Sequence, residues 1–345
     1  MAHDQEGSLW QRDANGFPAT AAREQQLRFL VGYATLAPSG HNAQPWQFGV
    51  GADSIFVLAD RRRALPVVDP KDRELTISCG AAIGTLETAA RRFSFQASVA
   101  LLPDDGNPDH LAQITFSEGQ PPDKHEIALF DAIQARRTNR TAYFMEELPG
   151  DLLTECSDVA ADFGVSLDWS NDNDVMETIA GLVAEGDQVQ FGDPRFRREL
   201  GSWVRSSVLG SRDGMSGKGF GMPDILSPIG RFVIRTFDLG GGVAASDQKK
   251  ILSASPALAV LSSANDDPES WVNTGRALAR VLLALTAKGY TASYLNQPIE
   301  IDTLRPKLAA AVGITGYPQI LLRVGRSTDE IDPSVRRKLS DVIVM

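Results

Sequence analysis

Two segments far apart in the chain carry the same arrangement of residues. The first, CGAAIGTLETAARRFSFQASV, begins at Cys79, and the second, TGRALARVLLALTAKGYTASY, begins at Thr274. Each contains a glycine, apolar residues at helical spacing, a basic residue, an aromatic residue and a strand-like exit. The likeness predicts an internal duplication with a buried central helix in each half. Helix amphipathicity alone also produces such likeness, so the alternative of two unrelated helices stays open.

The composition is typical of a soluble globular chain, long enough for two domains or for one unit built from two halves. Of the 345 residues, 43% are hydrophobic, 23% charged and 7% aromatic. The net charge of −10 repels nucleic-acid phosphates and anionic lipid headgroups, so we expect neither nucleic acid nor membrane as a partner. The two cysteines and four scattered histidines provide neither a disulfide framework nor metal-ligand spacing, so no metal is expected.

The N-terminal sequence lacks the cationic and apolar regions of a secretory signal, and no apolar run is long enough to cross a bilayer. We therefore expect a cytoplasmic protein whose residues 1–22 form a flexible arm. The first half is placed at residues 23–122 and the second at residues 123–345. A lid-like insertion is expected at about 201–242, because that region is rich in Gly, Arg and Ser.

The segment APSGHNAQPWQF, residues 37–48, is predicted to be a loop at the C-terminus of a helix, because Pro38 and Gly40 interrupt the helical spacing before it. WQFGV and SIFVLAD follow as a hairpin of two strands. A Pro-Ser-Gly turn followed by Asn exposes backbone N–H groups and short polar side chains, which suit a flat polar heterocycle. A surface loop that only caps the helix is the alternative. Trp46 and Phe48 are interpreted as core residues.

Basic residues gather at two further places. The segment RRTNR, Arg136 to Arg140, ends the predicted helix EIALFDAIQARR, and its guanidinium groups suit a phosphate. A solvated helix terminus favoured by the macrodipole is the alternative. In QILLRVGRS, predicted as the last strand, Arg323 and Arg326 flank Gly325, which allows a ligand to approach closely.

Other motifs that carry chemistry are absent or weak. The segment GKGFG does not follow a strand and open a helix, and it lacks Walker spacing. Neither a G-x-S-x-G elbow nor H-E-x-x-H occurs, so hydrolase function has no support. Cys79, just ahead of a predicted helix, is interpreted as a buried structural cysteine rather than a reactive thiol.

Jointly, the motifs resemble the flavin-dependent nitroreductase superfamily, and specifically its Acg-like branch. The resemblance covers roughly Gln25 to Ser327 and rests on the loop and arginine segments together with DPKDRELTISCGAA, DPRFRREL, SYLNQP and GYPQILLRVGR. It implies an α+β fold with helices around mixed sheets. Ordinary members are homodimers with two FMN sites at the interface, each built from an arginine segment of one subunit and a Pro-Ser-x-x-Asn loop of the other. Here each element occurs once, which implies two fused half-repeats that form an intrachain pseudo-dimer with one FMN.

The resemblance also implies which residues contact FMN. Arg136, Arg137 and Thr138 would contact the phosphate, the ribityl chain and the pyrimidine edge of FMN. Arg140 would lie beside N1 and O2 of the flavin. Arg323 and Arg326 would complete the phosphate clamp. The loop that closes over from the other half would contribute Pro38, Ser39, Gly40 and Asn42. The backbone near N5 would be that of Tyr294, Leu295 and Asn296.

The function implied by this resemblance is electron transfer from NAD(P)H through FMN to a small organic acceptor such as a nitroaromatic or a quinone. The flavin itself carries the chemistry, and a nearby cation and N–H donor tune it. The expected assembly is a monomeric pseudo-dimer or a loose homo-oligomer. Thr138 stands where the family has Ser, and residues 201–242 could cover the flavin. The alternative is therefore a non-catalytic protein that stores, sequesters or senses FMN.

Overall fold

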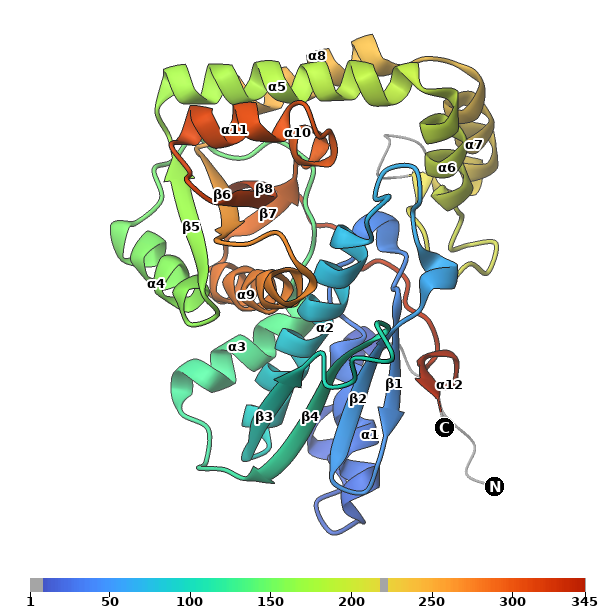
Figure 1. The fold of residues 1–345 in the computed structure, drawn as a ribbon, viewed down its shortest axis with the longest axis vertical. Helices are drawn as coiled ribbons and strands as arrows, with labels where there is room; N and C mark the ends of the chain where they lie inside the picture. Colours follow the sequence, from blue (N-terminus) through green and yellow to red (C-terminus); the bar gives the residue numbers. More distant parts are fainter. Residues whose placement is uncertain (1–8, 218–222, 345) are drawn as a thin grey trace.

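The computed structural model describes residues 9–217 and 223–344, which form two β-sheets with helices around and between them (Figure 1). The first sheet has the strand order β3-β4-β2-β1-β9 and the second β5-β6-β8-β7. The elements of the first part of the chain are α1 (Arg23–Ala34), β1 (Trp46–Val50), β2 (Ser54–Ala59), α2 (Arg73–Arg92), β3 (Phe95–Leu101) and β4 (His110–Glu118). We call these elements the first motif.

The second sheet belongs to a second motif, which follows α3 (Lys124–Ala135). Its elements are α4 (Gly150–Ala161), β5 (Val165–Ser170), β6 (Ala257–Ser263), α9 (Pro268–Ala287), β7 (Thr291–Tyr294) and β8 (Tyr317–Gly325). Between β5 and β6 lie α5 (Asn173–Gly192), α6 (Pro194–Trp203), α7 (Ser227–Thr236) and α8 (Gly240–Ser253). Between β7 and β8 lie α10 (Gln297–Glu300) and α11 (Arg305–Val312).

The two motifs have the same topology. In each, the first strand pairs antiparallel with the second, the second with the fourth and the fourth with the third. A 20-residue helix joins the second and third strands, α2 in one motif and α9 in the other. α2 begins at position 73 and α9 begins at position 268, which is 195 residues later. A residue with a left-handed φ angle follows each helix, Ser94 after α2 and Gly289 after α9, and these two residues are also 195 positions apart.

The equivalent helices α2 and α9 cross in direct contact at the centre of the molecule (Figure 1). The contact is possible because glycines occupy the crossing point. A Cβ on Gly80 would lie 2.2 Å from the backbone O of Val272, and a Cβ on Gly275 would lie 2.0 Å from the backbone O of Ile77. The glycine shared by the two similar segments therefore holds the motifs together.

Apolar periodicity explains the other elements. In β2 the residues alternate between half-buried and buried, as expected for a strand with one face on the core. β6 is buried along its whole length, because Ala259 and Leu261 pack into the large core while Leu258 and Val260 pack into a second core under α5. Cys79 lies inside α2 rather than ahead of a helix, since the helix begins at Arg73. Its thiol is buried, and burial raises its pKa, as expected for a structural cysteine.

The end of the chain returns to the first motif. After β8 the chain reaches α12 (Leu339–Val342) and the two-residue strand β9 (Ile343–Val344), which pairs parallel with β1. The sequence predicts β8 as the last strand, and this prediction is wrong because β9 follows it. The first sheet is mixed because of β9, as expected, whereas the named strands of the second sheet pair only antiparallel.

The segment between β5 and β6, residues 171–256, is much longer than the tight turn between β1 and β2, and we call it the insertion. It crosses over the second sheet and places α6 and α7 beside the loops of the first motif (Figure 1). The expected lid at 201–242 is only part of it. Residues 218–222, including most of GKGFG, lie outside the described residues, as do residues 1–8 of the expected arm. Within the arm, Trp10 is buried and its Nε1 donates to Ser334 O at 2.7 Å.

Candidate functional site

The loop after α1 has an unusual backbone. His41, Asn42 and Gln44 all have left-handed φ angles, at 50°, 54° and 53°. Such conformations cost energy in residues other than glycine and concentrate where a site requires them. Ser39 stabilises the turn, because its Oγ accepts a hydrogen bond from Gln44 N at 2.9 Å. Pro38 and Gly40 are half-buried in this loop, and Gly40 N donates to Ser78 Oγ of α2.

The arginine segment begins where α3 ends. Arg136 is buried and its Nη2 donates to Leu36 O at 3.3 Å, so it touches the end of α1. Thr138 forms an isolated bridge with Ala292, and Asn139 N donates to Ala292 O at 3.1 Å. The segment therefore runs between the loop of the first motif and β7 of the second.

Arg140 is the residue of this segment that faces open space. Its side chain is exposed to solvent, yet burial lowers its pKa, so the guanidinium reaches water while protein surrounds it. Tyr294, Asp247 and Tyr143 are close enough to act on it electrostatically. Among the described residues, none accepts a hydrogen bond from Arg140 or forms an ion pair with it.

Tyr294 presents a second polar group without a partner. Its hydroxyl is buried and makes no hydrogen bond with any described residue. Burial raises the pKa of Tyr294 to about 12, although the charges of Arg136 and Arg140 act in the opposite direction. Buried polar atoms are nearly always hydrogen-bonded in native proteins, so an orphaned hydroxyl beside two arginines marks a place where a ligand or water belongs.

His41 joins this group from the first motif. Burial lowers its pKa to about 4, and the next cause is the charge of Arg140. His41 is thus a neutral imidazole close to Arg140. The loop of the first motif, the arginine segment and the end of β7 therefore converge on one place, although sequence reasoning named the loop without naming His41.

Carboxyl groups line the neighbouring side of the site. Asn296 Nδ2 and Arg73 Nη2 each donate to Glu74 Oε1 at 3.0 Å. Burial raises the pKa values of Glu74 and Glu300, which interact with each other. A Cβ at Gly40 would lie 3.7 Å from Glu74 Oε2, so this carboxyl group is beside the loop. Nothing in the sequence pattern distinguishes Glu300, since a lone Glu in a short helix has no characteristic spacing.

Other groups of the protein already contact the side chains of three expected arginines, Arg323, Arg326 and Arg137. Arg323 is 1% exposed, and its donors bind Ser293 Oγ, Ser255 Oγ and the carbonyls of Ala254 and Thr141. Arg326 is exposed and stacks on the ring of Tyr290, with its Cζ 4.3 Å from the ring centroid.

Arg137 lies over the ring of Trp10 at 4.5 Å and donates to the carbonyls of Gln134, Arg136 and Ile331. The backbone of Leu295 also has a partner, because its N donates to Leu321 O at 2.9 Å.

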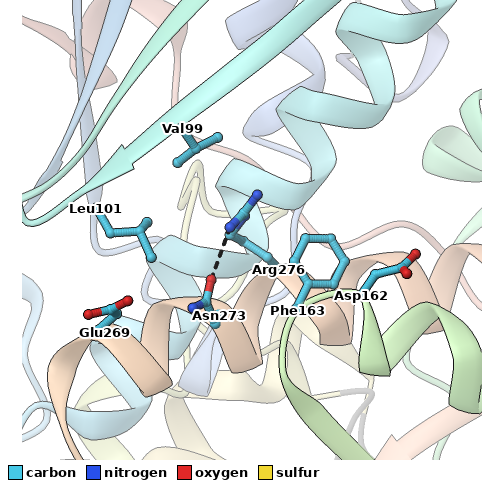
Figure 2. Close-up of a pocket in the computed structure, with 7 residues that line it drawn as sticks. All are labelled: Val99, Leu101, Asp162, Phe163, Glu269, Asn273 and Arg276. Carbon is cyan, nitrogen blue, oxygen red and sulfur yellow. Dashed lines mark hydrogen bonds between the residues drawn. The ribbon is translucent and has the colours of Figure 1, made fainter.

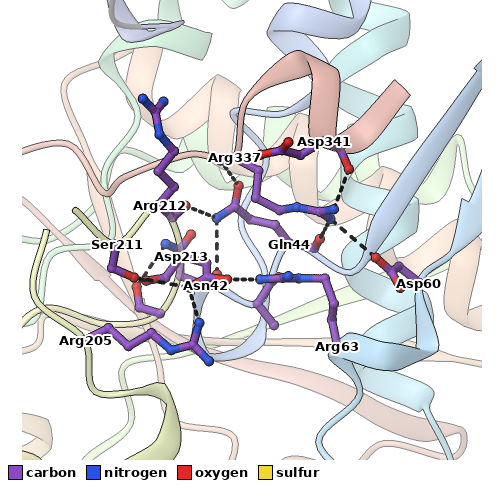
Figure 3. A network of polar contacts seen from close by, with 12 residues as sticks. Asn42, Gln44, Asp60, Arg63, Arg205, Ser211, Arg212, Asp213, Arg337 and Asp341 are labelled. Atoms are coloured by element: carbon purple, nitrogen blue, oxygen red, sulfur yellow. Dashed lines mark hydrogen bonds and ion pairs between the residues drawn. The ribbon is translucent and has the colours of Figure 1, made fainter. Parts of the chain in front are cut away.

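Asn42 is held by the insertion and by the C-terminal segment. Its Nδ2 donates to Gly214 O at 3.0 Å and Val335 O at 3.2 Å, and its Oδ1 accepts from Arg336 Nη1 at 3.0 Å. Beside it, Asp213 of the insertion bridges Arg63 and Arg205, and Gln44 Nε2 donates to Arg212 O (Figure 3). The insertion is therefore fastened directly to the candidate site.

Arg336 is a buried arginine that sequence reasoning missed. It donates to the carbonyls of Thr35, Leu36 and Ala37, where a helix C-terminus attracts cations. Burial lowers its pKa far below the usual range, and Arg136 and Arg137 lower it further. No described carboxylate forms an ion pair with Arg336, Arg136 or Arg140, so positive charge accumulates here and would suit an anion.

The described residues include no group of three or more His, Cys, Asp or Glu side chains that could hold a metal ion. In the same part of the chain, no helix combines the length and the apolar character that crossing a membrane requires.

Comparison with known proteins identifies the family. No family model matches the sequence. The chain is 34% identical over 328 residues to a Mycobacterium tuberculosis protein named "Putative NAD(P)H nitroreductase Rv3131", a match that covers 92% of this chain and 91% of the relative. The chain belongs to the nitroreductase family. Another nitroreductase-named relative from the same organism, acg, is 27% identical over 343 residues, covering 94% of this chain and 97% of acg.

The nitroreductase-like fold also occurs in a solved structure. A protein described as a putative nitroreductase from Anabaena variabilis matches 88% of this chain and 88% of its own length, with a TM-score of 0.51 and 11% identity. At this identity the match supports the fold alone. The expected nitroreductase-like α+β fold with two sheets is confirmed.

Proposed function

We propose that this nitroreductase-family protein is an FMN-dependent NAD(P)H oxidoreductase that passes electrons to a small organic acceptor such as a nitroaromatic or a quinone. In this proposal the two motifs form an intrachain pseudo-dimer with one flavin between them. The observation that carries it is the meeting of Arg140, the orphaned Tyr294 hydroxyl and His41 in one place. These residues come from both motifs, as a site between two halves requires.

The residues present fit FMN by charge and by hydrogen-bonding capacity. The excess of arginine charge around Arg136 and Arg336 suits a phosphate dianion. No described residue binds the donors of Arg140, which suit the polar edge of a ring system, and His41 of the loop is close enough to Arg140 to feel its charge. Arg137, Thr138, Arg326 and the backbone from Tyr294 to Asn296 remain proposed contacts. Protein acceptors already bind the donors of Arg323, so we do not assign Arg323 to the phosphate clamp.

When bound, FMN supplies the redox chemistry, accepting electrons from a reduced nicotinamide and delivering them to an acceptor. The protein would contribute the position of the cofactor and the electrostatic field around it. Arg140 would stabilise negative charge on a bound ring system, and His41, whose pKa is lowered by burial to about 4, would add no second cation next to it. Burial raises the pKa values of Glu74 and Glu300, and the charge of Glu74 raises that of Glu300 further.

The experiment that tests the proposal compares FMN affinity in wild-type protein, Arg140→Ala and Arg140→Lys by visible absorption and equilibrium dialysis. Loss of the charge-assisted hydrogen bonds of Arg140 should weaken binding roughly 10-fold to 100-fold in the alanine variant, and less in the lysine variant. Arg28→Ala is the control, because Arg28 is partly exposed on α1 and its ion pair among the described residues is with Glu24. Equal affinity in all four proteins would contradict the site assignment.

The oxidoreductase activity is tested separately by adding NADPH and then NADH to the FMN-loaded protein without oxygen. Bleaching of the flavin bands that reverses on adding a quinone supports the enzyme. Persistent bands with both nucleotides would contradict turnover.

A non-catalytic role in FMN storage or sequestration is the second candidate. The observation that favours it is the attachment of the insertion to Asn42, Gln44 and Arg63. A segment fastened over the loop would restrict the approach of a nicotinamide or an acceptor. Persistent flavin bands in the wild type that bleach when the attachment is weakened would favour this role.

A further inference from the structure

An open groove of about 380 Å³ lies between the first sheet and the helices of the second motif. Val99 and Leu101 of β3 form one wall, and Glu269, Asn273 and Arg276 of α9 form the floor (Figure 2). Phe163 and Asp162, from the turn between α4 and β5, close one end. The volume is within the range of small-molecule sites in proteins.

The groove is the counterpart of the candidate flavin site in the duplicated fold. Because α2 and α9 are equivalent at an offset of 195 residues, Glu269 corresponds to Glu74 and Asn273 to Ser78. The offset continues past Ser94 and Gly289 into the third strands, where Val99 corresponds to Tyr294. Continued beyond the end of β7, the same offset matches Leu101 with Asn296.

The turn that closes the groove is equivalent in the same way. Asp162 and Phe163 lie between the first helix and first strand of the second motif. The loop at Pro38 to Asn42 has that position in the first motif.

The lining of the groove excludes the ligand proposed for its counterpart. No arginine segment reaches it, and Val99 and Leu101 replace the polar side chains of Tyr294 and Asn296 with an apolar wall. The single arginine of the lining, Arg276, is already paired with Glu87 through Nη2 at 2.7 Å and Nε at 3.0 Å. A phosphate would find no free cation among the lining residues.

The charge that remains in the groove is negative. The side chains of Glu269 and Asp162 are exposed, and no described residue donates a hydrogen bond to either carboxylate or forms an ion pair with it, although Arg280 is close enough to act on Asp162 electrostatically. The two carboxylates lie toward opposite ends of the groove in Figure 2. Asn273 Oδ1 accepts from Arg276 Nη1 at 2.9 Å, which leaves its Nδ2 without a described partner. Arg276 lies 4.7 Å from the centroid of the Phe163 ring. The groove thus combines two carboxylates, an aromatic ring and an apolar wall, and the net charge of −10 adds attraction for cations.

We propose that this groove is a second ligand site and that it binds a small organic cation with a flat aromatic ring system. The carboxylates of Glu269 and Asp162 attract the positive charge, while Val99 and Leu101 cover a face of the ring system. The proposal rests on the duplicated fold and the lining residues, not on the binding of FMN.

The test uses proflavine, a planar tricyclic cation, titrated into the protein by isothermal calorimetry with and without saturating FMN. We expect one proflavine per chain in both titrations, and no binding of the anion anthracene-9-carboxylate. The double variant Asp162→Asn/Glu269→Gln should weaken proflavine binding about fivefold to tenfold, because exposed charge pairs each contribute modestly. Val99→Trp, which fills the groove, should abolish it.

The matched control is Asp174→Asn/Glu177→Gln on the exposed side of α5, which changes the net charge equally at a distance from the groove. Proflavine affinity should be unchanged in this control. Absence of binding in the wild type, equal weakening in the control, or displacement of proflavine by FMN would overturn the proposal. Binding of proflavine by a protein that fails to retain FMN would support this site and contradict only the flavin proposal. Circular dichroism spectra verify that each variant is folded.

Discussion

Gly80 of α2 and Gly275 of α9 lie against each other at the centre of the molecule, at equivalent positions of the two motifs. A Cβ on Gly275 would lie 2.7 Å from Gly80 Cα, and a Cβ on Gly80 would lie 3.0 Å from Gly275 Cα. Neither glycine has a left-handed φ angle, so close packing rather than backbone conformation requires them.

Substitution of either glycine by alanine should destabilise the protein by about 1–3 kcal/mol or more, because the added methyl group meets backbone atoms that cannot move independently. Urea unfolding followed by circular dichroism measures the change. Gly181→Ala is the matched control, since Gly181 is exposed in α5 with nothing within 4 Å of the new Cβ. This control should stabilise the protein by about 0.5–1 kcal/mol. An unchanged free energy of unfolding in Gly275→Ala would show that α2 and α9 pack less closely than the structure indicates.

The pH dependence of stability should contain a contribution from His41. Its folded pKa of about 4 is below the ordinary value of 6.5, so between these values only the unfolded chain takes up the proton. Stability therefore falls as the pH decreases through this window. His41→Gln should remove about 1–2 kcal/mol of the difference between the unfolding free energies at pH 7.5 and pH 5. The same pH dependence in variant and wild type would mean that the imidazole is not shielded.

Substitution of Arg323 and substitution of Arg326 should have different effects on protein stability and on FMN affinity. Arg323→Ala leaves the buried groups that Arg323 binds without a donor, so we expect a loss of about 2–4 kcal/mol in urea unfolding. Arg326→Ala removes an exposed side chain and should change stability by less than about 0.5 kcal/mol. If Arg326 binds the phosphate as proposed, its loss weakens FMN binding alone. An unchanged FMN affinity in Arg326→Ala would contradict the assignment of Arg326 to the site.

The attachment of the insertion should depend on Asp213. Burial acts to raise the pKa of Asp213, but hydrogen bonding to Arg63 and the charge of Arg205 outweigh it and lower the pKa. Asp213→Asn should cost about 1–3 kcal/mol and should speed the release of FMN measured by stopped-flow fluorescence. Asp174→Asn on α5 is the exposed control. A release rate equal to that of the wild type would mean that the attachment does not limit FMN exchange.

Local patterns in the sequence were sufficient for much of the fold. The apolar periodicity around Ala82 and Ala277 predicted two central helices, which are confirmed. The shared topology of the two motifs is consistent with the duplication that the shared glycine suggests. The strands WQFGV and SIFVLAD pair as the predicted hairpin. Trp46 and Phe48 are buried in the core, as interpreted from the sequence.

Long-range contacts are what the sequence could not predict. Arg336 is part of a basic run, VRRK, which has the composition of a solvated surface segment. Its role depends on the return of the chain to the carbonyls that end α1, about three hundred residues away in sequence. Arg323 was likewise grouped with Arg326 by spacing, although alternation along a strand places their side chains in different surroundings. His41 had no signal beyond its position in the loop.

The insertion occurs in only one of two otherwise equivalent motifs, and this has an evolutionary consequence. In a homodimer one gene encodes both subunits, so every change appears at both symmetric sites. A fused chain of the kind proposed here would be free from this constraint, because each copy of the motif would accumulate its own substitutions. The proposed flavin site could then keep its arginines beneath the insertion while the groove at Glu269 and Asp162 became open and acidic, and selection could act on each separately.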